Sequence, residues 1–175
     1  MPAVYLLKTE RLGIRKFFME DAPFLFDLVN SPGWLEHIGD RDIKTLQAAK
    51  EYLQSRYLEG YQEEGFGFYV LELLSDRVKV GTSGFIKRDF LEEIDVGFAL
   101  LPEHEGKGYA FEATSAIIDF GKTEFGIDRT VAITSPENAR SIRLLKKLGY
   151  RFERQVAWPE TLEPLMLFGR GIGKP

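Results

Sequence analysis

The segment over residues 101–113, LPEHEGKGYAFEA, limits the possible fold of this chain more than any other stretch. An apolar run ends at a proline, two glycines flank Lys107, and a helical pattern that includes Ala113 and Ile117 begins directly afterwards. Glycines allow consecutive backbone N–H groups to converge on one point, and a helix start adds unpaired N–H groups and a positive dipole end. The segment therefore predicts a strand, a tight loop and a helix that together bind an anion such as a pyrophosphate.

The loop matches neither of the two common nucleotide-binding patterns. Its spacing is not GxxxxGK[ST], and no GxGxxG occurs in the chain. Taken alone, the segment is explained equally well by glycines that serve only a tight turn. The choice between these two interpretations depends on the other parts of the sequence.

The other segments predict alternating strands and helices. Residues 11–17 alternate apolar and polar side chains, which is the period of a half-buried strand. Acidic residues followed by Pro23 favour a helix start, and Thr45 is a suitable N-cap for a second helix. Residues 34–43 are expected to form the loop between these two helices. Further strands are expected at residues 66–74, 78–90, 92–101, 129–134, 150–158 and 165–168, and further helices from residue 109 and at residues 139–148.

The short connections between residues 66 and 101 predict an antiparallel meander. The chain is therefore expected to adopt an α/β (α+β) fold, with a central, mostly antiparallel sheet and helices packed against it. No repeat or Pro/Gly-rich linker divides the 175 residues, so a single domain over residues 1–175 is expected.

Composition excludes several classes of function. The net charge of -4 disfavours a nucleic acid partner, because an acidic surface repels phosphate backbones. There is no cysteine, which removes thiolate metal sites and a thiol nucleophile, and the only histidines are His37 and His104, so no metal site is expected. No segment approaches membrane-spanning length, and the expected location is the cytoplasm.

A second segment, residues 134–150, follows one strand after the glycine loop. It reads TSPENARSIRLLKKLGY, with an Asn-x-x-Ser pair where a Leu-rich helix begins and a glycine where it ends. A capped amphipathic helix explains the segment by itself. Together with the glycine loop, however, it resembles the GNAT superfamily of N-acetyltransferases. The resemblance is closest to the RimJ/RimL-type branch, whose opening strand resembles TERL at residues 9–12.

The resemblance implies a sheet of about six to seven strands that is splayed in the middle and flanked by about four helices. It also implies acetyl-CoA as co-substrate, with the pantetheine arm pairing with an open strand edge and Asn138 and Ser141 facing that arm. Glu105 lies where the family usually has Gln or Arg, and its carboxylate is expected to turn to solvent. The cofactor-binding residues implied by the resemblance are Phe98, Ala99, Leu100, Glu105, Gly106, Lys107, Gly108, Tyr109, Ala110, Asn138 and Ser141.

In the family the amine attacks the thioester directly, without a covalent enzyme intermediate. We expect Asp95 to be the general base, with Glu93 as the alternative on the same strand face. Many family members have a tyrosine acid where this chain has Leu145. Ser141 is therefore the expected proton donor, and Tyr109 is a weaker candidate.

The acceptor is an amine whose identity the sequence leaves open. Substrate contacts are expected from residues 34–43, with Asp40 attracting a cation and Trp34 covering an apolar part. The leading hypothesis is the N-terminus of a protein or peptide. The alternatives are a small amine (a polyamine, amino acid or aminoglycoside) and an acyl-CoA-binding module without turnover. Dimers are common in the family, so a homodimer is an expectation that rests on the resemblance alone.

Overall fold

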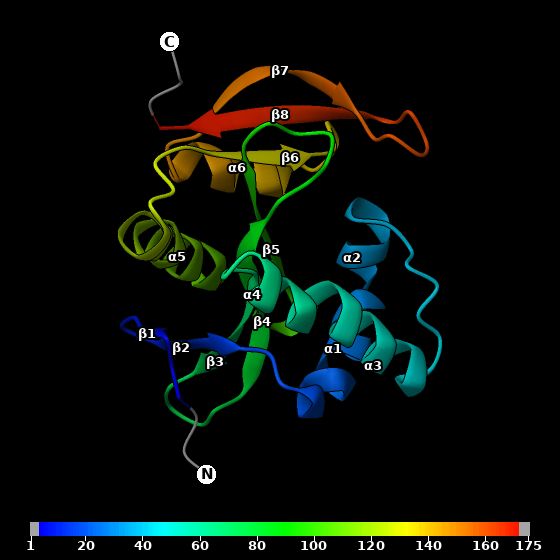
Figure 1. The fold of residues 1–175 in the computed structure, drawn as a ribbon, viewed down its shortest axis with the longest axis vertical. Coiled ribbons are helices and arrows are strands. Elements are labelled where there is room, and N and C mark those ends of the chain that lie inside the picture. Colours follow the sequence, from blue (N-terminus) through cyan, green and yellow to red (C-terminus); the bar gives the residue numbers. More distant parts are fainter. Residues whose placement is uncertain (1–3, 172–175) are drawn as a thin grey trace.

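The computed structural model describes residues 4–171, and its central feature is an eight-stranded sheet in the order β1-β2-β3-β4-β5-β6-β8-β7 (Figure 1). All neighbouring strands are antiparallel except β5 and β6, which are parallel. The strands are β1 (Leu7–Lys8), β2 (Leu12–Lys16), β3 (Phe68–Leu73), β4 (Lys79–Ile86), β5 (Ile94–Leu100), β6 (Thr130–Thr134), β7 (Arg151–Ala157) and β8 (Pro164–Arg170).

The helices are α1 (Ala22–Val29), α2 (Pro32–His37), α3 (Leu46–Leu53), α4 (Glu59–Glu63), α5 (Tyr109–Phe125) and α6 (Ala139–Lys147), with short helical turns η1 (Met19–Asp21), η2 (Gln54–Leu58) and η3 (Pro102–His104). The predicted fold class, a mixed and mostly antiparallel sheet flanked by helices, is confirmed. The sheet has one strand more than the upper expected number, because the two residues of β1 pair with β2. The predicted N-cap is also confirmed, since Thr45 Oγ1 accepts the N–H of Ala48.

The prediction of a loop over residues 34–43 is wrong in its first part. Residues 32–37 form α2, with Pro32 in the first turn and Ser31 as N-cap. Proline favours this position because its fixed φ suits a helix and the N–H that it lacks would have no partner there. The remaining residues, 38–45, form the connection to α3.

The sheet parts between β5 and β6. β4 pairs with β5 as far as Leu100. β6 meets β5 at only two positions, opposite Ile94 and opposite Asp95. From Val96 onward, the side of β5 that faces β6 has no strand partner in the described chain, as the resemblance implies for a splayed sheet.

Each face of the sheet is covered by a different set of helices. One core cluster packs α5 and α6 against the sheet through Ile117 and Leu145, and Val96 of β5 belongs to it. The other cluster packs α1 and α3 through Leu25 and Leu53. Figure 1 shows α5 and the helices α1–α3 at opposite sides of β4 and β5. Because successive strand side chains alternate between faces, the carboxylate of Asp95 lies on the opposite face from Val96.

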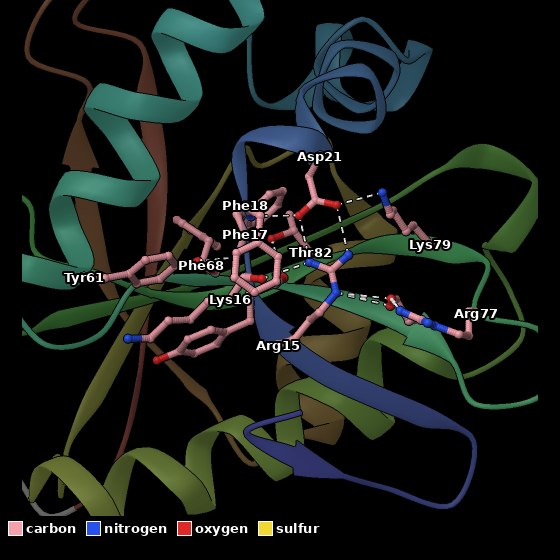
Figure 2. A network of polar contacts seen from close by, with 12 residues as sticks. Arg15, Lys16, Phe17, Phe18, Asp21, Tyr61, Phe68, Arg77, Lys79 and Thr82 are labelled. Atoms are coloured by element: carbon pink, nitrogen blue, oxygen red, sulfur yellow. Dashed lines mark hydrogen bonds and ion pairs between the residues drawn. The ribbon is translucent and has the colours of Figure 1, made fainter. Parts of the chain in front are cut away.

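A buried ion network joins η1 to the strands β2, β3 and β4 (Figure 2). Arg15 donates to both oxygens of Asp21, at 2.7 and 2.9 Å, and to both oxygens of Glu72, at 3.1 and 3.2 Å. Lys79 Nζ lies 2.7 Å from Asp21 Oδ1, and the N–H of Phe18 donates to Asp21 Oδ2. Burial opposes ionisation of Asp21, but these donors hold its pKa below the ordinary value.

Candidate active site

The cofactor loop, residues 105–110, connects η3 to the start of α5. Gly106 and Gly108 have φ of +73° and +84°, a left-handed conformation that side chains rarely adopt. Gly108 is the N-cap of α5 and provides no side-chain cap, and the first backbone bond of the helix runs from Glu112 N–H to Gly108 O. The N–H groups of the first turn therefore point out of the helix end, which is the arrangement expected for an anion site.

Arg11 supports this loop from the N-terminal part of the chain. Its Nη1 donates to the carbonyl oxygen of Lys107 at 2.8 Å, and its Nε pairs with Glu112 at 2.7 Å. Thr9 Oγ1 and the Arg11 N–H both donate to the second Glu112 oxygen. The guanidinium also lies 4.5 Å from the ring centroid of Tyr109, which places Tyr109 as a packing residue of the loop. The sequence predicted residues 9–12 only as part of the opening strand. In the structure, Arg11 of this segment contacts the cofactor loop.

The expectation that the carboxylate of Glu105 turns to solvent is wrong. Its carboxylate forms an ion pair with Arg140 in the first turn of α6, which connects the cofactor loop to the second predicted segment. Its other oxygen lies close to Gly33 of α2. The pair neutralises the one carboxylate of the loop, so the negative charge of Glu105 is offset beside the predicted pyrophosphate site.

The start of α6 lies one strand after this loop. Asn138 is its N-cap, and Oδ1 accepts the N–H of Ser141 at 3.1 Å. This bond fixes the orientation of the Asn138 side-chain amide and leaves its NH₂ group as the available donor. Leu145, where many family members have tyrosine, is 1% exposed and belongs to the core. Asn138 and Ser141 are both half-buried, so their predicted contacts with the pantetheine arm remain compatible with the structure.

Asp95 is buried at the point where β5 and β6 part. It is 2% exposed, and Oδ2 accepts Arg88 Nε at 2.6 Å. Oδ1 is also buried and has no hydrogen-bond partner of normal geometry among the described residues. Burial raises the pKa of Asp95 to about 6, against the charge and hydrogen bond of Arg88 and the nearby N–H of Ile133. A carboxylate with a pKa near the working pH and an oxygen without a partner is suited to accept a proton.

Glu93, the alternative base, is placed differently. It precedes β5 and pairs with Arg129 Nε at 3.1 Å, while Arg129 also binds both oxygens of Glu153. Glu93 therefore belongs to a partly exposed ion network at the start of the strand. The geometry favours Asp95 over Glu93 as the base.

The two residues expected to contact the acceptor have other contacts in the structure. Trp34 is 7% exposed and packs in the core cluster of α1 and α3, a placement that favours a role in packing. Asp40 is exposed, pairs with Lys44 at 3.0 Å and accepts the N–H of Asp42. Neither contact excludes a transient approach of substrate, and the predicted substrate roles of Trp34 and Asp40 stay predictions.

Sequence reasoning missed Arg88 and Trp158, and it included Arg41 only as one of residues 34–43. Arg88 pairs with Asp95, and its guanidinium carbon lies 5.3 Å from the ring centroid of Trp158. Arg41 lies 5.8 Å from the same ring. These residues come from the β4–β5 connection, the α2–α3 connection and the end of β7, and no spacing in the sequence relates them. We call Arg41, Arg88, Asp95 and Trp158 the acceptor cluster.

These features fit acetyl-CoA. Left-handed glycines and a helix start offer backbone donors for the pyrophosphate, and the open edge of β5 offers backbone groups for the pantetheine arm. No group of residues suited to hold a metal ion occurs in residues 4–171. Across the same residues, every helix is too short or too polar to cross a bilayer.

Comparison with known proteins gives consistent matches. Residues 11–151 match the family model described as acetyltransferase (GNAT) domain. The chain is 34% identical over 151 residues to an uncharacterized N-acetyltransferase p20 of Bacillus licheniformis, covering 84% of this chain and 83% of that protein. A GnaT-family acetyltransferase structure from Bordetella pertussis superposes with a TM-score of 0.79 at 26% identity, covering 94% of this chain and 98% of that one.

A third likeness concerns the fold. The structure of a RimL ribosomal L7/L12 alpha-N-protein acetyltransferase in complex with coenzyme A superposes with a TM-score of 0.80 at 17% identity, covering 94% of this chain and 96% of that one. At this identity the likeness shows the fold alone. The family match and the site geometry together lead to one conclusion: the chain belongs to the GNAT acetyltransferase family and is an N-acetyltransferase that uses acetyl-CoA.

Proposed function

We propose that this protein acetylates the N-terminal amine of a peptide or protein, with Asp95 as general base. The observation that supports this most directly is the coincidence of three features in β5 and its following loop. The strand edge opens after Asp95, the cofactor loop follows the same strand, and a buried carboxylate with an unpartnered oxygen lies where the opening begins. An amine that reaches Asp95 would therefore meet an acyl group carried along the open edge.

The proposed roles divide the reaction among few groups. Acetyl-CoA supplies an activated thioester carbonyl. Asp95 takes a proton from the substrate ammonium, directly or through a water, and returns it to solvent. A backbone N–H of the open β5 edge donates to the carbonyl oxygen as negative charge develops there. A carbon–nitrogen bond forms and the carbon–sulfur bond breaks. Ser141 donates its proton to the leaving thiolate and regains one from the nitrogen, which loses its second proton as the amide forms.

Three of the carboxylates described above support an acceptor with one positive charge, because each is already paired with a cation of the protein. Asp40 pairs with Lys44, Glu93 pairs with Arg129, and Glu105 pairs with Arg140. A polyamine or aminoglycoside carries several cations and needs several carboxylates for them. A peptide N-terminus needs only one for its ammonium, and Asp95 is suited to that role.

Structural neighbours include enzymes of both acceptor classes. Besides RimL, a spermidine N-acetyltransferase SpeG chimera superposes with a TM-score of 0.75 at 15% identity. Likeness at this level leaves the acceptor class open, so the proposal rests on the charges of the site and on a direct assay. Purified protein with acetyl-CoA should release coenzyme A thiol with peptide amides and much more slowly with spermidine. Faster release with spermidine would contradict the proposed acceptor.

Two glycine variants test the cofactor loop. Gly108 and Gly126 are the left-handed residues at the two ends of α5, so substitution by alanine strains the backbone similarly at both. A Cβ at Gly108 would lie 3.2 Å from Arg11 Nη2, beside the predicted pyrophosphate, whereas nothing lies within 4 Å at Gly126. We expect Gly108→Ala to weaken acetyl-CoA binding roughly tenfold or more, and Gly126→Ala to leave it unchanged, as measured by calorimetry. Equal affinities of the two variants for acetyl-CoA would contradict the assignment of residues 105–110 to pyrophosphate binding.

A further inference from the structure

The acceptor cluster holds two guanidinium groups around one indole ring. The guanidinium carbons of Arg41 and Arg88 lie 5.8 and 5.3 Å from the centroid of Trp158, and Phe90 contacts the same ring edge-on at 5.6 Å between centroids. Arg88 also pairs with Asp95, the proposed base. Through Arg88 and Trp158, the cluster therefore connects Asp95, the proposed base, with Arg41 of the α2–α3 connection.

Arg41 differs from Arg88 because no carboxylate of the described residues pairs with it. None of the ion pairs within residues 4–171 includes Arg41. Its Nε is buried and meets no hydrogen-bond acceptor in the described part of the chain. A buried donor of a charged group without an acceptor costs free energy, so the site is incomplete until something else accepts from it.

The other groups around Arg41 do not provide an acceptor for its buried Nε. Tyr57 of η2 lies near Arg41. Burial raises the pKa of the Tyr57 hydroxyl, and the positive charge of Arg41 opposes this rise. Glu160 accepts the indole N–H of Trp158 at 3.3 Å, and Asp40, on the same connection as Arg41, pairs with Lys44. Asp42, the remaining acid of that connection, is exposed. Within residues 4–171, the cation of Arg41 is thus left without a paired carboxylate.

We propose that Arg41 binds a carboxylate of the acceptor, close to the amine that is acetylated. This inference rests on the proposed function and narrows it to amines that carry a nearby carboxylate. A guanidinium binds carboxylates with two parallel hydrogen bonds, and Trp158 provides an apolar surface for the carbon chain between the two groups. The amine would then point toward Asp95 while the carboxylate pairs with Arg41.

Two kinds of molecule carry this chemistry, and the assay separates them. The carboxylate belongs either to an acidic side chain near a peptide N-terminus or to the acceptor's own α-carboxyl group. Three peptide amides, Ala-Glu-Ala-Ala, Ala-Gln-Ala-Ala and Ala-Lys-Ala-Ala, test the first source, and alanine against alaninamide tests the second. We expect the glutamate peptide to exceed the lysine peptide roughly tenfold or more in kcat/KM, with the glutamine peptide between them. A higher kcat/KM for alanine than for alaninamide would instead identify the acceptor's own α-carboxyl group as the partner of Arg41.

Arg41 variants connect this preference to the residue. Arg41→Gln should abolish the preference, Arg41→Glu should reverse it in favour of the lysine peptide, and Arg41→Lys should keep part of it. Arg56→Gln removes the same charge from an exposed position of η2 and should leave the preference intact. Calorimetric affinity for acetyl-CoA should be the same in all of these proteins, which shows that each one is folded.

The outcomes separate this inference from the proposed function. Equal kcat/KM for acceptors with and without a carboxylate, in both wild type and Arg41→Gln, overturns the inference and leaves the acetyltransferase proposal standing. Unchanged preference in Arg41→Glu overturns it as well. If no peptide is acetylated although acetyl-CoA binds, the proposed acceptor fails, and the role of Arg41 fails with it.

Discussion

Two buried aspartates of this protein pair with arginine, and their surroundings differ. Asp21 in η1 has both oxygens occupied by Arg15, Lys79 and a backbone N–H, and its pKa is lowered (Figure 2). Asp95 in β5 has one oxygen bound by Arg88 and one without a hydrogen-bond partner of normal geometry among the described residues, and burial raises its pKa to about 6. The comparison teaches that Asp21 is held as a fully satisfied part of the fold, whereas the surroundings of Asp95 leave one of its oxygens available for the proposed proton transfer.

The largest expected effect comes from breaking the satisfied network. Arg15→Ala leaves Asp21 and Glu72 buried without their main partner, so the free energy of unfolding should fall by roughly 3–5 kcal/mol. Arg77 approaches Glu72 at 3.8 Å with a half-exposed side chain, and Arg77→Ala should cost no more than about 1 kcal/mol. Urea denaturation measures both. Similar losses in the two variants would contradict the structural role assigned to Arg15.

Asp95→Asn should impair turnover while leaving acetyl-CoA affinity nearly unchanged. The amide has the shape of the carboxyl group but cannot take the proton, so kcat/KM for the amine should fall on the order of 100-fold or more. In wild type, kcat/KM should decline with falling pH below about 6, because protonation of Asp95 removes the base. That decline should be missing from the residual activity of Asp95→Asn. An unchanged pH profile in the variant would rule out Asp95 as the base.

The two aspartates should also have opposite effects on stability as pH changes. The lowered pKa of Asp21 stabilises the folded state above the ordinary aspartate pKa, and this contribution is lost as pH falls through the lowered value. Because the pKa of Asp95 is raised, the folded state loses stability as pH rises from the ordinary aspartate pKa to about 6, and the loss is complete above that value. Asp95→Asn should therefore remove a loss of stability between about pH 4 and 7. Thermal unfolding across this range measures the effect, and parallel curves for wild type and variant would contradict it.

A smaller effect is expected at the partly exposed pair of Arg11 and Glu112. Arg11→Ala removes the hydrogen bond to the Lys107 carbonyl and should raise KM for acetyl-CoA roughly tenfold, equivalent to about 1.4 kcal/mol, with little change in kcat. Arg154→Ala on β7, at the other edge of the sheet, should leave this KM unchanged. Steady-state kinetics with varied acetyl-CoA checks the difference. A fall in kcat with an unchanged KM for acetyl-CoA would contradict a role of Arg11 in cofactor binding.

The smallest effect is expected at the partly exposed pair of Glu105 and Arg140. Glu105→Gln removes a negative charge beside the predicted pyrophosphate, so acetyl-CoA should bind roughly two- to fivefold more tightly at low salt, and less so at high salt. Glu103→Gln on η3 removes an exposed charge outside the cofactor loop and serves as control. Calorimetry at two salt concentrations measures both. Weaker binding in Glu105→Gln would mean that its ion pair with Arg140 matters more than its charge.

The sequence by itself determined the features that arise within a few residues of one another. Alternation and turn signals predicted the sheet and helices, and glycine spacing predicted the loop before α5, because hydrogen-bond geometry and allowed φ angles act locally. The caps at Thr45 and Asn138 follow the same rule. The exception is α2, where a short helix started by Pro32 lacks enough residues to show a period.

Only the tertiary structure decided which charges meet. Arg11 reaches Lys107, Arg88 and Arg41 meet at Trp158, and Glu105 pairs with Arg140 rather than with water. A charged side chain in a sequence carries no sign of its partner or of its burial, since both depend on which distant segments the sheet brings together. Desolvation depends on the same arrangement, and it makes Asp95 a candidate base while Asp21, also paired with arginine, stabilises the fold.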